Sequence, residues 1–324
     1  MKKSIFLYLF LALLLIFIHV NLYQYAFDDA YIHFRVARNF VNTGFPYYNV
    51  GEPLKVSTST GWVQVLSLIQ YLLNIIGFSS YLPYAVSVYN SIVTLFAVLI
   101  FKRILEQLLG HPLTLLKQTL FIIPATVVLL PTSVGLMETP TALLIFGIGI
   151  LLTVQKKDLG MFPLGLAIYF RVELMVPLIL TMAYLFRVRQ LKLRGLFYLS
   201  LGIIPLIVFD LYFYHTIIPH SMIAKSKLYD IGILSTLFAL IYQSLPSLTF
   251  INSLAINGIV FISSLAFTVW VLIRNKESNP WITIFLLWSL VIISGYLVQR
   301  VQLFEWYRPL FLLPLILVVF YLFE

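Results

Sequence analysis

The chain has 324 residues, of which 61% are hydrophobic, 16% aromatic and only 10% charged, and its mean hydropathy is +0.99. Water-soluble globular domains are nearer half apolar, so this composition excludes one and indicates a polytopic membrane protein. The net charge of +9 does not indicate a nucleic-acid partner, because the lysines and arginines are spread between apolar runs. This distribution is typical of residues that set membrane topology and contact anionic lipid headgroups. The absence of cysteine excludes disulfides, thiolate metal sites and cysteine nucleophiles.

The N-terminus joins a basic start to an apolar run over residues 4 to 22. This run is longer than the core of a signal peptide, and no small-x-small cleavage site precedes Asp28. We therefore expect an uncleaved first span. Lys2 and Lys3 would hold the N-terminus inside, so that the following stretch emerges on the outer face.

The longest polar stretch runs from Phe27 to Trp62 and opens with two acids, Asp28 and Asp29. At about 100° per residue, a helix sorts its next residues onto two faces. The polar face would hold Asp28, Tyr31, Arg35, Arg38 and Asn39, and the apolar face Ala30, Phe34, Ala37 and Val41. This pattern predicts an amphipathic helix on the membrane surface, with Asp29 about 100° away from Asp28.

Further apolar stretches follow along the chain, several of them short or interrupted by proline. They lie at residues 61 to 78, 83 to 101, 118 to 131, 139 to 154, 160 to 186, 196 to 214, 231 to 249, 254 to 273, 281 to 298 and 309 to 323. A span needs about 20 residues, so some of these would be half-helices. We expect one all-α membrane domain over residues 1 to 324, with about 9 to 11 spanning or half-spanning helices. No separate soluble domain is expected, and the outer loops would lie at 23 to 60 and about 215 to 230.

The topology depends on residues 61 to 78. If every stretch crosses the membrane, Lys102, Arg103, Lys117, Lys156 and Lys157 fall outside, against the positive-inside tendency. If residues 61 to 78 do not cross, these basic residues move inside. Arg171 and Glu173 then lie outside, between two half-helices. We favour this second scheme.

Other charged and polar residues interrupt the apolar runs at few places. A charge at membrane depth costs about 2.5 to 3.5 kcal/mol even on insertion scales, which makes each of them a candidate for function. They are Glu138, Arg171, Glu173, His220, Lys225, Trp306 and Arg308.

The order of residues in the first loop resembles the GT-C integral-membrane glycosyltransferases, especially the bacterial branch that includes the arabinofuranosyltransferases of cell-wall arabinan. In that branch the loop reads approximately D-D-A-Y-I-x-x-R-Y-A-R-N, then G, N-x-G-E, T-S and a Trp. The matching residues are Asp28, Asp29, Ala30, Tyr31, Ile32, Arg35, Ala37, Arg38, Asn39, Gly44, Asn49, Gly51, Glu52, Thr58, Ser59 and Trp62.

Four later segments also resemble steps of that family: SVGLMETP, YFRVE, IIPHSMIAK and FEWYRPL. The chain departs from the family pattern at Lys55, where an acid is common, and at Thr60, Val172 and His220, where Pro, Pro and Asn are usual.

The resemblance implies an inverting glycosyltransferase of the bacterial cytoplasmic membrane. It would move a sugar from a polyprenyl-phosphate donor to a glycan, lipid or protein acceptor on the outer face. An acceptor hydroxyl needs a general base, for which Asp28 is the choice, with Asp29 and Glu138 as further catalytic candidates. The departing lipid phosphate needs cations, for which the candidates are Lys55, Arg171, Lys225 and Arg308. The remaining substrate-binding candidates are Tyr31, Arg35, Arg38, Glu52, Glu173, His220 and Trp306.

Each of these features also has a plainer interpretation. Asp28 and Asp29 could cap a helix. They could also bind a divalent cation, which is the one cofactor that the sequence suggests. Arg171 and Glu173 could form a structural ion pair. Lys225 could be a headgroup anchor, and Arg35 and Arg38 could be snorkelling surface charges.

Two other functions compete with sugar transfer. A secondary transporter or lipid flippase would use the charges to line an outer cavity, but the chain lacks the two related halves that transporters often show. A structural subunit of an envelope complex would leave the polar residues dispensable. The ordered first-loop pattern favours the enzyme.

Overall fold

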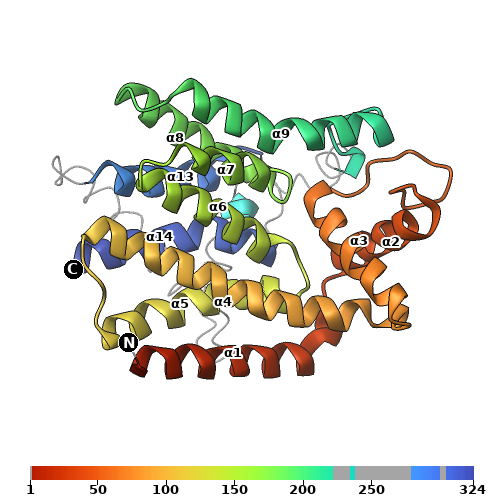
Figure 1. The fold of residues 1–324 in the computed structure, drawn as a ribbon, viewed down its shortest axis with the longest axis horizontal. Helices are drawn as coiled ribbons and strands as arrows, with labels where there is room; N and C mark the ends of the chain where they lie inside the picture. The colour runs from red at the N-terminus through yellow and green to blue at the C-terminus, as the bar shows by residue number, and fades with distance from the viewer. Residues whose placement is uncertain (1, 222–233, 238–278, 300–303) are drawn as a thin grey trace.

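The computed structural model describes residues 2–221, 234–237, 279–299 and 304–324, and every regular element in this part of the chain is helical (Figure 1). Six helices within it are long and apolar enough to cross a membrane: Ile5–Tyr25, Ser79–Leu109, Leu115–Val134, Leu193–Tyr214, Pro280–Val298 and Glu305–Phe323. The expected all-α polytopic membrane fold is therefore confirmed.

The helices follow the apolar stretches of the sequence closely. The six spanning segments contain α1 (Lys2–Leu22), α4 (Leu82–Leu109), α5 (Leu115–Val134), α9 (Leu193–Tyr214), α13 (Pro280–Gln299) and α14 (Arg308–Phe323). The other helices are α2 (Asp28–Thr43), α3 (Thr60–Ile75), α6 (Thr139–Val154), α7 (Met161–Ala167) and α8 (Met175–Arg187). The stretch at 254 to 273 lies outside the described residues, as does nearly all of 231 to 249.

The bundle is built around α6, which packs between α4 and α7 (Figure 1). Helix α9 covers α7, while α13 packs against α8 and α14, and α1 packs against α4 and α5. Small residues allow the closest approach, between α7 and α9. A Cβ added to Gly202 would lie 2.4 Å from the carbonyl oxygen of Phe162, so only glycine fits there.

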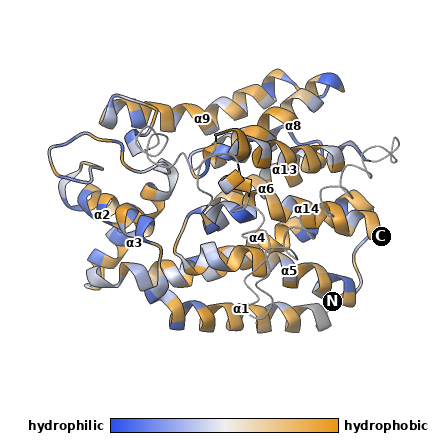
Figure 2. Ribbon diagram, turned by 180° about the vertical axis from the view of Figure 1, so that it is seen from behind, coloured by the Kyte–Doolittle hydropathy of each residue, from blue (hydrophilic) through white to orange (hydrophobic). Residues whose placement is uncertain are grey.

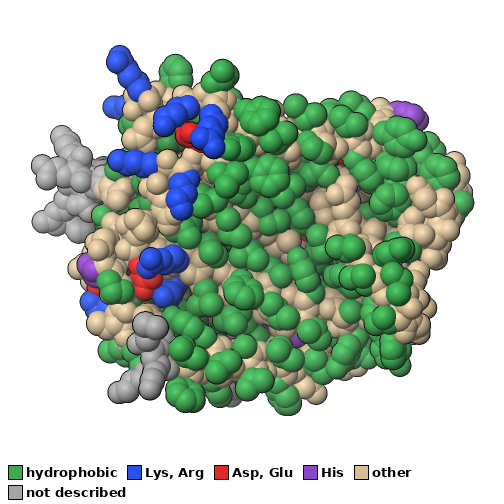
Figure 3. All heavy atoms as spheres, viewed as in Figure 1, with side chains coloured by type: hydrophobic (Ala, Val, Ile, Leu, Met, Phe, Trp, Pro, Cys, Tyr) green, Lys and Arg blue, Asp and Glu red, His purple; other side chains and the backbone are tan. Residues whose placement is uncertain are grey.

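The helices are mostly hydrophobic along their length (Figure 2), and the space-filling view shows hydrophobic side chains over the middle of the molecule (Figure 3). On α1, for example, Phe6, Phe10, Leu13 and Phe17 are 63 to 74% exposed and lie on one side of the helix. Side chains of this kind exposed on successive turns are suited to lipid chains rather than water. Many polar groups inside the bundle are instead hydrogen-bonded to one another.

One such polar network joins α1, α4 and α5. The Nε2 atom of His19 lies 2.6 Å from the Oγ atom of Ser133, which is also 2.6 Å from the Oγ1 atom of Thr94. Asn90 donates to the carbonyl oxygens of Ser133 and Met137. These bonds stabilise a polar layer that would otherwise be costly at membrane depth.

The two ends of the bundle differ in charge. Both termini lie at one end, where the space-filling view shows the lysines and arginines gathered (Figures 1 and 3). We call this the basic end. There Lys117 lies 2.5 Å from the carboxylate of Glu324, and the hydroxyl of Tyr8 donates to Gln118. Helices α2 and α3 lie at the opposite end, which we call the loop end (Figure 1).

This arrangement agrees with the scheme in which residues 61 to 78 do not cross the membrane. Helix α3 has 16 residues and is not among the six helices of spanning length. In that scheme the basic residues that follow it, from Lys102 to Lys157, lie on the same side as the N-terminus. The expected break in residues 160 to 186 is also present, since Arg171 and Glu173 lie between α7 and α8.

Cysteine labelling can test this topology, because the chain has no native cysteine. The exposed positions Val50 and Ser80 flank α3, while His111 and Gln190 are exposed at the basic end. We expect single cysteines at 50 and 80 to react with an impermeant maleimide from one side of the membrane, and those at 111 and 190 from the other. Labelling of positions 50 and 80 from opposite sides would instead mean that α3 crosses.

Candidate functional site

The acidic turn at the start of α2 is fastened to the rest of the bundle by the residue before it. The backbone N–H of Phe27 donates to the carbonyl oxygen of Gly135 at 3.1 Å, at the end of α5. The ring of Phe27 lies 5.0 Å from that of Trp306, next to the start of α14. Asp28 and Asp29 then form the first turn of α2, where the helix dipole favours carboxylates.

The two faces of α2 are as the sequence predicts. Ala30, Phe34 and Ala37 are buried, whereas Asp28 and Arg35 are exposed. The carboxylate of Asp28 accepts a hydrogen bond from the backbone N–H of Asp29, and no ion pair of Asp28 is found among the described residues. The side chain of Asp29 is half-buried and lies on the same side of the helix as His33, four residues later.

A buried group of charges lies beneath this helix, centred on Glu138. One oxygen of its carboxylate lies 2.9 Å from Nη2 of Arg171, and the other lies 4.0 Å from Nε2 of His33. Arg171 also approaches Glu173 at 3.8 Å, and Glu173 accepts a hydrogen bond from the hydroxyl of Tyr296. The closer partner of Arg171 is thus Glu138, not the Glu173 that the sequence suggested.

His33 connects this buried group to the first loop. Its Nδ1 atom lies 2.9 Å from the Oγ atom of Ser57, which in turn accepts a hydrogen bond from the backbone N–H of Ser59. Ser59 is the N-cap of α3, and its side chain accepts from the N–H of Trp62. The end of the loop and the start of α3 are therefore positioned by the same histidine that faces Glu138.

The local backbone directs Glu138 and Arg171 toward each other. Glu138 is the residue before α6, but its side chain does not cap that helix. Arg171 is in an extended conformation, with φ −147° and ψ 112°, at the break between α7 and α8. Both side chains are almost fully buried, with 1% and 6% of the side-chain surface exposed.

The electrostatics keep Arg171 charged. Burial opposes its charge, but the carboxylates of Glu138 and Glu173 outweigh burial and raise its pKa above the ordinary value of arginine. The Nε and Nη2 atoms of Arg171 and the Oε2 atom of Glu138 have no aligned hydrogen-bond partner among the described residues. Buried polar atoms normally have partners, so the Nε–H group of Arg171 can donate to a ligand or water and the Oε2 atom of Glu138 can accept from one, while Nη2 already lies 2.9 Å from the other oxygen of Glu138.

Arg35 contacts the first loop and Arg38 contacts α3 in this structure. The guanidinium of Arg35 donates to Asn49 at 3.0 Å and lies 4.2 Å from the ring centre of Tyr48. Arg38 approaches the side-chain oxygen of Gln70 on α3 at 3.4 Å. Both arginines are exposed but oriented by these contacts rather than extended into solvent.

Lys55 is separate from the Glu138 group. Its ammonium lies 2.5 Å from the carboxylate of Asp210 in α9 and donates to the carbonyl oxygen of Ile217. The hydroxyl of Thr60 donates to the other oxygen of Asp210 at 2.7 Å. Burial lowers the pKa of Lys55, although Asp210 opposes that shift. This geometry makes Lys55 an anchor of the loop on α9, in place of the expected contact with phosphate.

The remaining candidates lie around these two groups. His220 joins the Lys55 group, because the backbone N–H of Lys55 donates to its Nδ1 atom at 3.1 Å. Glu52 is exposed and accepts from Asn49, and Tyr31 is 51% exposed. Lys225 lies outside the described residues.

The C-terminal candidates are buried beside Arg171. The ring of Trp306 is stacked on that of Phe304 at 4.5 Å and also contacts Phe27, and its carbonyl oxygen accepts from Thr139. Arg308 is buried and lies 3.6 Å from Glu305. The guanidinium of Arg171 lies 5.3 Å from the ring centre of Tyr307. Tyr307, in the turn just before α14, thus lies against Arg171.

A metal site is not evident in the described part of the chain. No group of three or more His, Cys, Asp or Glu side chains there is arranged to hold a metal ion. The carboxylate oxygens of Asp28 and Asp29 suit hard cations. These two residues by themselves would fill only part of a coordination shell, and other ligands would have to supply the rest. The divalent cation stays a prediction that depends on these two residues.

No protein-family model, no curated protein and no solved structure matches this chain.

Three participants were not identified from the sequence: His33, Asp210 and Tyr296. Asp210 had a usable signal, because a carboxylate within an apolar span is expensive without a partner. His33 lies within the polar stretch, but nothing in its spacing indicates that it faces Glu138. Tyr296 lies in an ordinary apolar run, and only the packing of α13 against α8 brings it to Glu173.

The Lys55–Asp210 pair gives a direct test of stability. Asp210→Asn leaves a buried ammonium without its counter-charge, and we expect a loss of about 3 to 5 kcal/mol. Detergent-solubilised protein should show this as a clearly lower unfolding temperature. The double variant Lys55→Met with Asp210→Leu, which removes both charges, should recover most of the loss. An Asp210→Asn protein as stable as the parent would contradict the assignment of Lys55 as a buried anchor.

Proposed function

We propose that the chain is an inverting GT-C-type glycosyltransferase of the bacterial cytoplasmic membrane, which moves a sugar from a polyprenyl-phosphate donor to an acceptor on the outer face. One observation carries the proposal. Four segments that resemble steps of that family, far apart in the sequence, meet at the loop end. Phe27 bonds to Gly135, Glu138 pairs with Arg171, and Trp306 contacts Phe27.

A fifth segment that resembles the family, IIPHSMIAK, also contacts the first loop. The chain at His220 pairs with the backbone of Lys55 in both directions, at 2.9 and 3.1 Å. A structural or lipid-transport role gives no reason for these particular segments to converge. Sugar transfer does, because a base, a leaving-group site and an acceptor site must be adjacent.

In this proposal Asp28 is the general base. Its carboxylate is exposed in the first turn of α2 and has no ion-pair partner among the described residues. It can therefore take the proton from an acceptor hydroxyl as that hydroxyl attacks the anomeric carbon. Glu138 is less suited to this task, because Arg171 holds its carboxylate.

Arg171 and Arg308 are the cations proposed for the departing phosphate. The Nε hydrogen of Arg171 is not aligned with any described acceptor, so an anionic oxygen can bind it, while Nη2 already lies 2.9 Å from Glu138. Glu138 and Glu173 then orient the guanidinium rather than consume all of its donors. The membrane orientation follows from the basic end, which the positive-inside tendency assigns to the cytoplasm.

The role of Asp28 can be tested in membranes or detergent with a polyprenyl-phosphate-linked sugar. We expect Asp28→Asn to lower the rate of sugar transfer about 100-fold or more, because the amide cannot accept the proton. Membrane insertion should be unchanged, and Glu324→Gln at the basic end serves as the carboxylate control. Full turnover by Asp28→Asn would reject Asp28 as the base and move attention to Asp29.

The role of Arg171 can be tested by a substitution that keeps the positive charge but removes the planar guanidinium with its several N–H donors. We expect Arg171→Lys to raise the KM for the lipid donor about tenfold, since one charge-assisted hydrogen bond is worth roughly 1.5 to 3 kcal/mol. The KM for the acceptor should change little. Arg187→Lys, at the end of α8 near the cytoplasm, is the matched control. An unchanged donor KM would leave Arg171 a structural partner of Glu138.

A further inference from the structure

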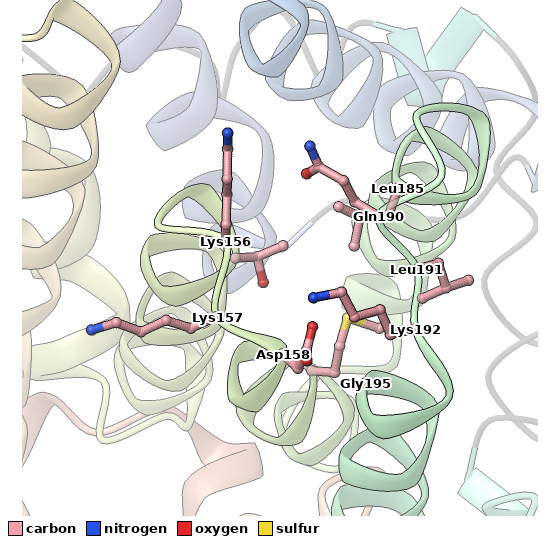
Figure 4. Close-up of a pocket in the computed structure, with 10 residues that line it drawn as sticks. Lys156, Lys157, Asp158, Leu185, Gln190, Leu191, Lys192 and Gly195 are labelled. Atoms are coloured by element: carbon pink, nitrogen blue, oxygen red, sulfur yellow. The ribbon is translucent and has the colours of Figure 1, made fainter.

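A second charged site lies at the basic end, far from the Glu138 group. A cavity of about 130 Å³ lies between the end of α6 and the turn that joins α8 to α9 (Figure 4). Helix α6 runs from Glu138 to this cavity, and its 16 residues span about 24 Å. The cavity is therefore distinct from the site proposed for sugar transfer.

The lining of the cavity is mainly cationic among its charged groups. Lys156, Lys157 and Lys192 contribute to it, against a single acid, Asp158. None of the three lysines forms an ion pair with a carboxylate in the described part of the chain, whereas Lys102 and Lys117 at the same end do. Lysines from two separate segments thus converge on one hollow and keep their charges available.

The close-up shows which of these groups face the hollow. Lys156 and Gln190 extend along the same side and Lys192 extends toward the middle of the hollow, while Lys157 extends away (Figure 4). Gly195, in the first turn of α9, completes the wall, and that helix begins without a side-chain cap. Two lysines and the positive end of a helix dipole favour an anion there.

Apolar side chains are exposed beside the basic residues where α8 ends and α9 begins. Phe186, in the last turn of α8, and Leu193 and Phe197, in the first turns of α9, are 58 to 83% exposed. A soluble anion would gain nothing from these side chains, but a lipid would place its acyl chains against them and its phosphate near the lysines. The chemistry of the cavity and of its rim therefore fit one amphipathic ligand.

We propose that this cavity binds the phosphate headgroup of an anionic membrane phospholipid, chiefly through Lys156 and Lys192. The lipid lies in the leaflet at the basic end and is neither donor nor acceptor of the reaction proposed above. Its acyl chains lie along the exposed side chains of the α8–α9 turn. The bound lipid then links the end of α6 to the start of α9.

Native mass spectrometry of the full chain in detergent tests this, with phosphatidylglycerol as the probe and phosphatidylcholine as the zwitterionic reference. We expect phosphatidylglycerol to bind in preference to phosphatidylcholine. The double variant Lys156→Gln with Lys192→Gln should weaken the affinity for phosphatidylglycerol roughly 30-fold, because each lysine near a membrane surface contributes somewhat less than a factor of ten. Lys156→Arg with Lys192→Arg should keep the binding.

The control variant is Arg103→Gln with Arg187→Gln, which removes two charges from the basic end outside the cavity. Equal weakening in the control would overturn the proposal in favour of a diffuse charge effect. Soluble glycerol 3-phosphate should not compete at concentrations near those of the lipid. If it does, the site binds a free phosphate and the lipid assignment fails. Sugar transfer is not the readout, so the result is independent of the catalytic assignment.

Discussion

The contact between Glu138 and Arg171 is the interaction on which the loop end depends. It joins the start of α6 to the break between α7 and α8, and both partners are buried. Removing either charge would leave the other buried without compensation, which is far more costly than the pair itself. Because His33 and Glu173 approach the same two side chains, the amphipathic helix and α13 are also positioned by it. The geometry of four separated segments thus follows from one ion pair.

The same principle explains the contrast between the two ends of the bundle. At the loop end, two ion pairs are buried between distant segments, Lys55 with Asp210 and Glu138 with Arg171. At the basic end, lysines and arginines extend toward the surface, and several have no carboxylate partner in the described residues. Exposed cations of this kind suit the headgroup region, whereas buried pairs fix a shape.

Much of the fold could be predicted from the sequence because each apolar run needs its own helix in a membrane. The faces of α2 followed from helical periodicity, and the half-helices around Arg171 followed from the cost of a charge within an apolar run. The partners of the charges could not be predicted in this way. Lys55 and Asp210 are 155 positions apart, and periodicity carries no information on which distant helix will supply a counter-charge. The sequence therefore indicated where partners were needed without identifying them.

The first loop is fastened at both ends, by Phe27 to Gly135 and by Lys55 to Asp210. Between these points Asn39 donates to the carbonyl oxygens of Tyr47 and Tyr48, so the middle of the loop is also held to α2. A segment tied at three places has already lost most of its conformational entropy before any ligand arrives. A ligand that binds against the first loop would therefore contact a surface that is already ordered. Little of its binding free energy would be used to order the chain.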